Sequence, residues 1–335
     1  MNMIEAQQIA EQFGLNGQCS IVRDLIKIET TYGLKCIRRV NYSMERLKYI
    51  YDAKEYLIKK GYDFIDRFLL SRDDNPNIIY NNGIYVLTDW IEGRECNFDN
   101  FGDVKIATEN LAKLHYCSTG YLPSDGIEIR SELGKLPMIL EKRSQEMQKL
   151  KKIAKKGKSR FDYLFLENVD VFINKSIESL RIINSPIYNR LIEKEEKNRG
   201  ICHRDYSYHN LILNKEGNLY TINFDYCCYE LKVYDIASFL RKIMSVCNWN
   251  VEAAMNVINW YNAVYNIEQD EMKMIFALLE YPQKFWRIAN RYYNSRRTRP
   301  ETAFYNKLID VISEKEFYLD FLDKFEEYIM AGIKE

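Results

Sequence analysis

Glycine, proline and histidine are scarce in this chain, which has 14, 6 and 3 of them among its 335 residues. None of its eight cysteines belongs to a C-x-x-C pair, and so few histidines leave little material for a Cys/His zinc site. We therefore expect reduced, mostly buried thiols, as in an intracellular protein. We also find no repeat of the kind that builds solenoids and no low-complexity linker.

Excess charge and long apolar runs are also missing. The 48 Lys and Arg residues balance 48 Asp and Glu residues, so a nucleic-acid partner is disfavoured. No apolar run approaches the ~20 residues of a membrane span. The polar stretch 1–14 lacks the apolar core of a signal peptide, so we expect synthesis in the cytoplasm.

The periodicity of the first 92 residues predicts a small antiparallel sheet with one inserted helix. An amphipathic helix ends at Gly14, and strand-like runs cover 21–30 and 34–40. A second helix ends at Gly61, and Asn81-Asn82-Gly83 predicts a tight hairpin turn. We interpret 1–92 as an N-terminal lobe.

Residues 93–335 are mainly helical in period, apart from one predicted hairpin over 211–214 and 219–224. The fold class expected is therefore α+β, with two lobes of unequal size. A cleft between the lobes is the default ligand site.

The most informative stretch is 202–210, which contains the pattern H-R-D-x-x-x-x-N. This is the catalytic-loop pattern of protein kinases. Asp205 would accept a proton from, or orient, an attacking hydroxyl, and Asn210 would turn back to a metal ion on the ATP phosphates. His203 is expected to anchor the loop.

Further parts follow in kinase order. Lys35 lies on a predicted strand where a phosphate-binding lysine would sit. Its acidic partner stays open among Glu45, Asp52 and Glu55. The segment 86–93 leaves the small lobe, and its backbone, around Asp89 and Ile91, could pair with an adenine edge.

The chain resembles the aminoglycoside-phosphotransferase and choline-kinase branch of the protein-kinase-like fold, and more narrowly the spore-coat CotS-type family. The matching stretches are 111–115, 203–210, 223–227, 233–237, 281–286 and 292–293. The resemblance implies a bilobal kinase-like fold, ATP and Mg²⁺ as cofactors, Asp205 as catalytic base and Asn210 as metal ligand. It also implies that Asp235 braces the catalytic loop, and that the protein is made in the mother cell and deposited in the spore coat.

Two departures from the family pattern matter. Asn223 occupies the position of the usual second metal-binding Asp, and it offers a carbonyl oxygen without the charge that Mg²⁺ prefers. Asp225 would lie on the same face of an extended strand and could substitute for it. No glycine-rich phosphate loop lies between the first strands.

Two functions stay open. The first is an ATP-dependent phosphotransferase acting on a hydroxyl of a small molecule, sugar or coat component. The alternative is a catalytically weak or inactive kinase-like component of the spore coat that interacts with other coat proteins.

A basic face on a late helix also has two interpretations. Lys284, Arg287 and Arg291 share this face, and Arg296, Arg297 and Arg299 follow. The face could bind an anionic substrate or phosphate group, or it could be a solvated or salt-bridged face against the acidic C-terminal helices, and we favour the second.

Overall fold

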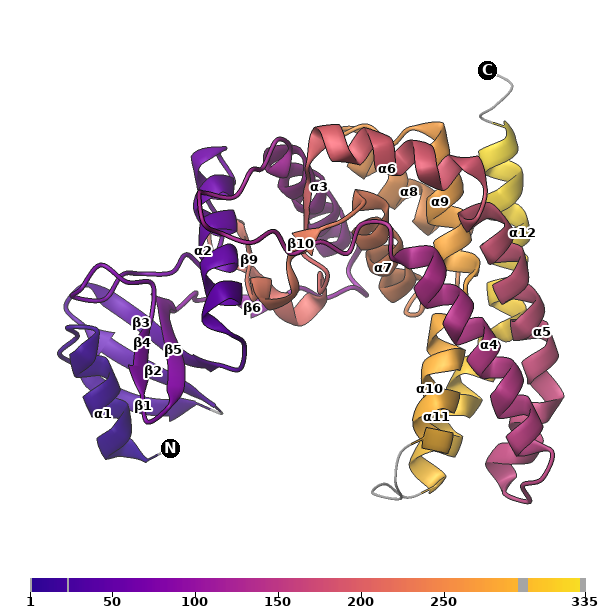
Figure 1. Cartoon of the computed structure of the whole chain (residues 1–335), viewed down its shortest axis with the longest axis horizontal. Helices are drawn as coiled ribbons and strands as arrows, with labels where there is room; N and C mark the ends of the chain where they lie inside the picture. Colours follow the sequence, from indigo (N-terminus) through magenta and orange to yellow (C-terminus); the bar gives the residue numbers. More distant parts are fainter. Residues whose placement is uncertain (1, 23, 295–300, 332–335) are drawn as a thin grey trace.

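The computed structural model describes residues 2–22, 24–294 and 301–331. An N-terminal sheet lies at one end of the molecule, and a larger helical part forms the rest (Figure 1). Arg296, Arg297 and Arg299 lie outside the described residues. None of the described helices is long and apolar enough to cross a membrane.

The N-terminal sheet has five antiparallel strands in the order β1-β2-β3-β5-β4. They are β1 (Gln18–Val22), β2 (Leu25–Thr30), β3 (Gly33–Val40), β4 (Ile78–Tyr80) and β5 (Gly83–Asp89). The single strand expected over 21–30 is wrong, because β1 and β2 are two paired strands. A β-branched run alone does not reveal a tight reversal within it.

Local signals explain the other boundaries. The helix α1 (Met3–Gln12) begins with a capping box between Asn2 and Glu5. Gly61, which follows α2 (Met44–Lys59), has φ +87°, a conformation that glycine adopts without strain. Asn81 and Asn82 both have positive φ, as the hairpin prediction required.

Both faces of the sheet are covered, and this decides which side chains reach the rest of the molecule. Ile37 on β3 packs in a core cluster with Ile9 of α1. Val40 packs in another cluster with Leu47 of α2. Since side chains alternate along a strand, odd-numbered residues of β3 face α1 and even-numbered residues face α2.

The C-terminal part is mainly helical, as expected. Its helices are α3 (Phe101–Ser118), α4 (Leu136–Ala154), α5 (Arg160–Ile183), α6 (Pro186–Asn198), α7 (Lys232–Met244), α8 (Val251–Asn262), α9 (Gln269–Glu280), α10 (Gln283–Asn294), α11 (Glu301–Ser313) and α12 (Lys315–Ala331). Its short strands are β6 (Arg94–Glu95), β7 (Ile201–Cys202), β8 (Leu211–Leu213), β9 (Leu219–Thr221) and β10 (Cys228–Tyr229).

The predicted hairpin is β8–β9, and β6 adds a third strand to it. Because β6 begins at Arg94 and already pairs with the C-terminal part, the chain leaves the N-terminal sheet between Asp89 and Arg94. The predicted lobe boundary at residue 92 stays a prediction. All eight cysteines are free, and six of them are buried.

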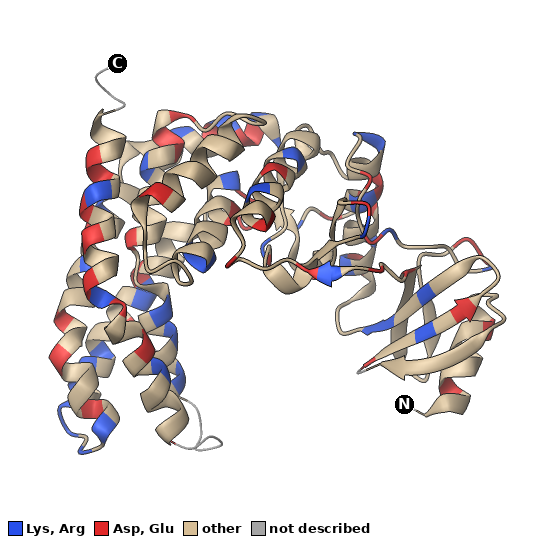
Figure 2. Ribbon diagram, turned by 180° about the vertical axis from the view of Figure 1, so that it is seen from behind, with Lys and Arg blue, Asp and Glu red and all other residues tan. Residues whose placement is uncertain are grey.

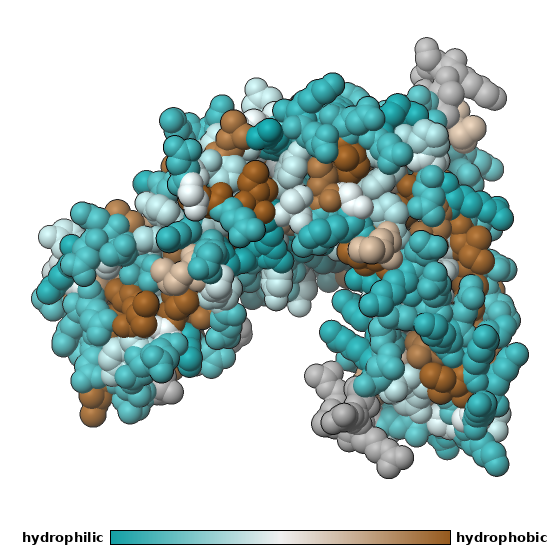
Figure 3. Space-filling view, viewed as in Figure 1, coloured by the Kyte–Doolittle hydropathy of each residue, from teal (hydrophilic) through white to brown (hydrophobic). Residues whose placement is uncertain are grey.

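The helices α4, α5, α10 and α11 form an arm that descends from the body of the molecule (Figure 1). Basic residues occur along much of this arm (Figure 2). The hollow between the arm and the sheet is bordered mainly by hydrophilic residues (Figure 3).

Lys54 of α2 is a fully buried cation whose ion-pair partner, Asp66, also belongs to the N-terminal part. Its Nζ lies 2.7 Å from both the carboxylate and the backbone oxygen of Asp66. It also lies 3.9 Å from the ring centroid of Phe68. Burial lowers the pKa of Lys54, although the Asp66 carboxylate opposes that effect.

We predict that Lys54→Ala destabilises the fold by about 3–5 kcal/mol, because it leaves the Asp66 carboxylate without its buried partner. Urea unfolding measures the difference. Lys48→Ala, at an exposed position of the same helix, is the control and should cost less than about 0.5 kcal/mol. Equal costs for the two variants would contradict a structural role for this ion pair.

Candidate active site

The catalytic-loop motif lies between β7 and β8, and Asp235 near the start of α7 holds its backbone. Asp235 accepts hydrogen bonds from the backbone N–H of His203 at 2.6 Å and of Arg204 at 2.9 Å. Arg204 has φ +69°, a strained conformation for a residue with a long side chain. The buried carboxylate therefore stabilises a backbone shape that the sequence alone disfavours.

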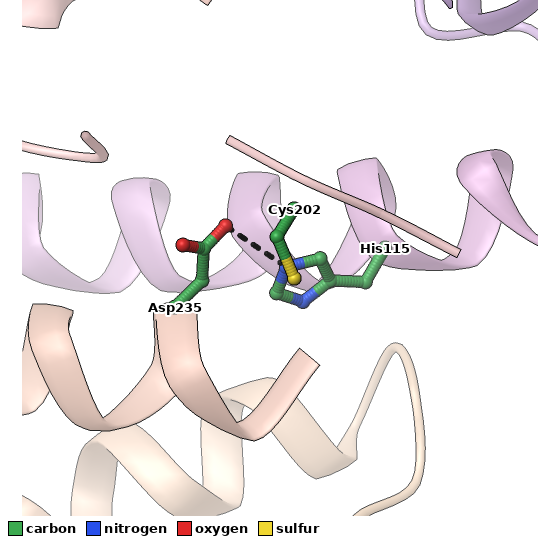
Figure 4. A group of neighbouring side chains, drawn as sticks. All are labelled: His115, Cys202 and Asp235. Carbon is green, nitrogen blue, oxygen red and sulfur yellow. Dashed lines mark hydrogen bonds and ion pairs between the residues drawn. The ribbon is translucent and has the colours of Figure 1, made fainter. Parts of the chain in front are cut away.

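His115 of α3 completes this buried support (Figure 4). Its Nε2 lies 3.4 Å from Asp235 and its Nδ1 lies 2.7 Å from the Tyr261 hydroxyl. Burial lowers the pKa of His115, so the ring is neutral and Nε2–H donates to Asp235.

Cys202 lies beside this pair, and these three residues are close enough together to hold a metal ion. Burial raises the pKa of the Cys202 thiol well above its usual value, which disfavours the thiolate that a metal needs. Both ring nitrogens of His115 and both oxygens of Asp235 already have partners in the protein. The cluster is therefore a support for the loop.

His203 is buried in the loop and has a partner on each ring nitrogen. Its Nε2 lies 3.0 Å from the backbone oxygen of Ile222, and its Nδ1 accepts the N–H of Asp205 at 3.2 Å. Burial lowers its pKa, so it is a neutral ring. This geometry suits an anchor better than a proton-transfer group.

Three of the predicted site residues lie together. Asn210 Nδ2 donates to the Asp205 carboxylate at 3.0 Å, which fixes the side chain of the expected base. Asn223 Nδ2 lies 3.4 Å from Asn210 Oδ1. The side-chain amide oxygen of Asn223, Oδ1, is buried and has no hydrogen-bond partner among the described residues.

An orphaned buried oxygen is costly unless something binds it. Amide oxygens are among the donors that Mg²⁺ and Ca²⁺ accept, so the side chains of Asn210 and Asn223 fit a divalent cation in donor type. Neither of them carries a negative charge. The residues therefore fit a weakly held ion.

Asp225 does not join this group, and the expectation that it shares a strand face with Asn223 is wrong. β9 ends at Thr221, Asn223 adopts the left-handed conformation with φ +67°, and a 3₁₀ turn (Phe224–Tyr226) follows. This turn directs the Asp225 carboxylate to Arg38 of β3, at 2.6 and 2.9 Å.

Arg46 of α2 also reaches this turn, where it donates to the backbone oxygen of Asp225. Its Nη1 is buried and has no partner among the described residues. A buried donor and a buried acceptor without partners, on Arg46 and Asn223, thus lie close to Asp225.

Lys35 lies on the opposite face of β3 from Arg38 and forms an ion pair with Asp89 of β5. None of the three acidic candidates for its partner, Glu45, Asp52 and Glu55, forms an ion pair with Lys35. Glu55 binds Arg67, Asp52 accepts from Tyr121 and Ser124, and Glu45 is exposed. The structure does not bring Lys35 together with Asp205, and its phosphate-binding role stays a prediction.

The segment after β5 keeps backbone groups free. Trp90 N–H donates to Leu34 at 3.0 Å. The backbone of Ile91 has no hydrogen-bond partner within the described chain. The adenine-binding roles of Asp89 and Ile91 stay predictions.

A cavity of about 450 Å³ opens beside the loop in the C-terminal part. Arg204 and Asp205 contribute to its wall, and its other lining residues come from positions 132–318. Arg204 lies over the ring of Tyr234, 3.6 Å from its centroid, and pairs with buried Glu230 at 3.3 Å. Asp205 therefore lies between the Asn210–Asn223 group and a cavity large enough for a small molecule.

Sequence reasoning missed Arg38, Arg46, Lys54 and Asp66. A signal existed for Lys54, since it falls within the apolar stripe of Leu47, Ile50 and Leu57 on α2. Asp66 accepts the backbone N–H of Asn223 at 3.0 Å and had no comparable signal.

The fold is the protein-kinase-like fold of the aminoglycoside phosphotransferases. A solved aminoglycoside phosphotransferase from Alicyclobacillus acidocaldarius subsp. acidocaldarius DSM 446 is similar, with a TM-score of 0.86 and 19% identity; the match covers 97% of this chain and 96% of that one. Spectinomycin phosphotransferase APH(9)-Ia, solved with ADP and spectinomycin, gives a TM-score of 0.61 at 13% identity, covering 94% and 97%.

Residues 6–325 match the family described as "spore coat putative kinase YutH", so the chain belongs to this spore-coat family. Spore coat protein S of Bacillus subtilis (strain 168) is 24% identical over 308 residues, which cover 91% of this chain and 87% of that protein. The predicted fold class and the resemblance to the CotS-type family are confirmed.

We predict a pH effect on stability from Glu230. Burial raises its pKa to about 7, although the Leu231 N–H and Arg204 oppose this. The folded protein therefore holds this proton more tightly than the unfolded chain. That stabilisation is complete below the pKa of the unfolded carboxyl and is lost as pH rises through about 7.

Glu230→Gln removes the titration. Between about pH 5 and about pH 8, its free energy of unfolding should rise relative to the native protein by up to about 3 kcal/mol. Chemical unfolding across this pH range measures the difference, with exposed Glu193→Gln as control. Parallel stability curves for the native protein and Glu230→Gln would contradict the raised pKa.

Proposed function

We propose that this protein is an ATP-dependent phosphotransferase that acts on a hydroxyl of a small molecule, sugar or coat component in the spore coat. One observation carries the proposal. Asp205, Asn210 and the orphaned oxygen of Asn223 lie together, and Asp205 also borders an open cavity. The nucleotide-bound spectinomycin phosphotransferase of similar fold supports ATP as the phosphate donor.

In this mechanism the acceptor hydroxyl enters the cavity and Asp205 accepts its proton. The acceptor oxygen forms a bond to the γ-phosphorus while the bond from that phosphorus to the bridging oxygen of ADP breaks. Asn210 keeps Asp205 oriented through its side-chain hydrogen bond. Mg²⁺ bound by Asn210 and Asn223 would neutralise charge on the phosphates.

The phosphates themselves need cations from the protein. Arg38 and Arg46 face the 223–226 turn, and the buried Nη1 of Arg46 is available to an anion. Their position favours them over Lys35, which lies on the far face of β3. The backbone at Ile91 is our candidate for the adenine edge.

The alternative is a catalytically weak or inactive kinase-like component of the spore coat that binds other coat proteins. The contacts of Asp225 support this alternative, because Arg38 donates to both oxygens of its carboxylate and competes with a metal ion for them. The sequence supports it as well, since it lacks a glycine-rich phosphate loop between the first strands. For either function we propose synthesis in the mother cell.

The first test is binding and turnover of ATP. Millimolar ATP with Mg²⁺ should raise the melting temperature, because a ligand of the native state stabilises it by about 2.7 kcal/mol at a hundredfold excess over Kd. Asp205→Ala should keep this shift and lose ATP turnover by about a hundredfold or more.

Glu216→Ala, in the exposed β8–β9 turn, is the control and should change neither binding nor turnover. The absence of any shift with Mg-ATP would exclude the phosphotransferase. A shift with turnover that is unaffected by Asp205→Ala would exclude Asp205 as the base.

The second test restores a carboxylate at the proposed metal site. Asn223→Asp should lower the Mg²⁺ concentration required for half-maximal ATP binding by about tenfold, because a charged oxygen binds a hard cation more tightly than an amide. Titration of Mg²⁺ at fixed ATP, followed by melting temperature, measures this effect.

Asn214→Asp is the matched control, since it adds the same charge in the β8–β9 turn, where its oxygen already accepts the N–H of Asn218. An unchanged Mg²⁺ requirement in Asn223→Asp would show that residue 223 is not a metal ligand.

A further inference from the structure

The cavity beside Asp205 has a surplus of positive side chains. Six cationic residues line it against four acidic ones: Arg143, Arg204, Arg241, Lys242, Lys284 and Arg287 against Glu132, Asp205, Glu230 and Glu314. An acceptor cavity for a neutral sugar would not require such a surplus.

Ion pairs account for only part of these charges. Lys284 pairs with Glu314 at 3.0 Å, as the favoured interpretation of the late basic face required, and Arg204 pairs with Glu230. Glu132 pairs with Lys135, which does not line the cavity. These ion pairs therefore engage three of the four acidic side chains that line the cavity.

Four cations remain without a carboxylate partner among the described residues. Arg143 donates to the Gln283 amide at 2.9 Å, Arg241 to the Leu278 carbonyl, and Lys242 to the Tyr206 carbonyl at 2.7 Å. Arg287 has no recorded hydrogen bond or ion pair within the described chain. The hydrogen bonds of Arg143, Arg241 and Lys242 thus go to neutral oxygens, and only Lys242 also feels nearby carboxylates, those of Asp205 and Asp235.

Concentrating positive charge in a partly enclosed space is unfavourable unless an anion offsets it. Burial lowers the pKa of Arg241 and of Lys242, and burial with the neighbouring Arg291 lowers that of Arg287. The four cations come from α4, α7 and α10, so they surround the cavity and do not form a single solvated helix face.

The nucleotide is not the anion that this cavity fits. No residue of the N-terminal sheet lines it, and neither do Asn210, Asn223 or Asp225. Asp205 is shared by the two sides, because it contacts Asn210 and also borders the cavity. The cations therefore surround the acceptor side of the base.

We propose that the acceptor is itself an anion: a hydroxyl-bearing small molecule, such as an acidic sugar or a polyol, that carries a carboxylate or a phosphate. Its anionic group binds the Arg143, Arg241, Lys242 and Arg287 side chains while its hydroxyl meets Asp205. The volume of about 450 Å³ suits a molecule of this size. This inference rests on the proposed phosphotransferase function for the acceptor role, but not for the binding of the anion.

The test compares matched probes that differ in charge. Glucose 6-phosphate and glucuronate carry an anion, glucose is neutral and glucosamine carries an amine. Inorganic phosphate is the minimal anion. Melting temperature and calorimetry at low ionic strength, without nucleotide, measure binding to the full chain. Transfer of labelled phosphate from ATP to each sugar is measured separately.

We expect the two anionic sugars to bind and the neutral and cationic sugars not to bind. Salt should weaken the binding, because these charges are partly exposed. Arg287→Gln should weaken it by at least about fivefold. Lys307→Gln, at an exposed position of α11 outside the cavity, is the control and should have no effect. Arg143→Gln tests a second wall of the cavity.

The outcomes separate the inference from the proposed function. Anion binding that depends on Arg287, in a protein that shows no melting shift with Mg-ATP, would support the anionic ligand and contradict the enzyme. Transfer to glucose or glucosamine in preference to the anionic sugars would support the enzyme and overturn the inference. The absence of binding by all the anions at millimolar concentration, or binding that is insensitive to both Arg287→Gln and Arg143→Gln, would also overturn it.

Discussion

The site depends on the carboxylate of Asp235 inside the C-terminal part. This carboxylate accepts hydrogen bonds from two consecutive backbone N–H groups, those of His203 and Arg204. It therefore holds Arg204 in a left-handed conformation that costs free energy, and this conformation orients the following residue, Asp205. The same helix carries Lys242 seven residues later, two turns along the same face. A single buried helix, α7, therefore fixes both the expected base and part of the cationic wall of the cavity.

Much of the fold follows from features that are local in the sequence. Apolar periodicity predicts α2 and a mainly helical C-terminal part, and glycine or asparagine in turns predicts the end of α2 and the β4–β5 hairpin. The H-R-D-x-x-x-x-N spacing locates Asp205 and Asn210, because these residues approach each other within one short loop. Asp235 is less local, and only the resemblance to a family connected it with that loop.

Where tertiary packing decides the orientation of a residue, the sequence is a weaker guide. β3 is covered on both faces, so its apolar pattern does not show which face meets the C-terminal part, and the period of two places Lys35 and Arg38 on opposite sides. The prediction that Asp225 shares a strand face with Asn223 is wrong for a different reason. β9 ends before Asn223, and the left-handed conformation of Asn223 leads into a 3₁₀ turn. Asparagine adopts this conformation readily, so no special residue type in the sequence marks the change.

The charges near the site divide into two functional sets. On the side proposed for the nucleotide, Arg38 and Lys54 pair with Asp225 and Asp66, so the protein's own cations use carboxylates that a metal ion would otherwise use. Asn223 contributes no charge there. This arrangement favours binding of phosphates by fixed arginine side chains and lowers the dependence on a divalent cation. On the side proposed for the acceptor, four of the six cations that line the cavity lack a carboxylate partner among the described residues. A site with this balance is suited to bring two anions together, and Asp205 lies between them as the remaining carboxylate.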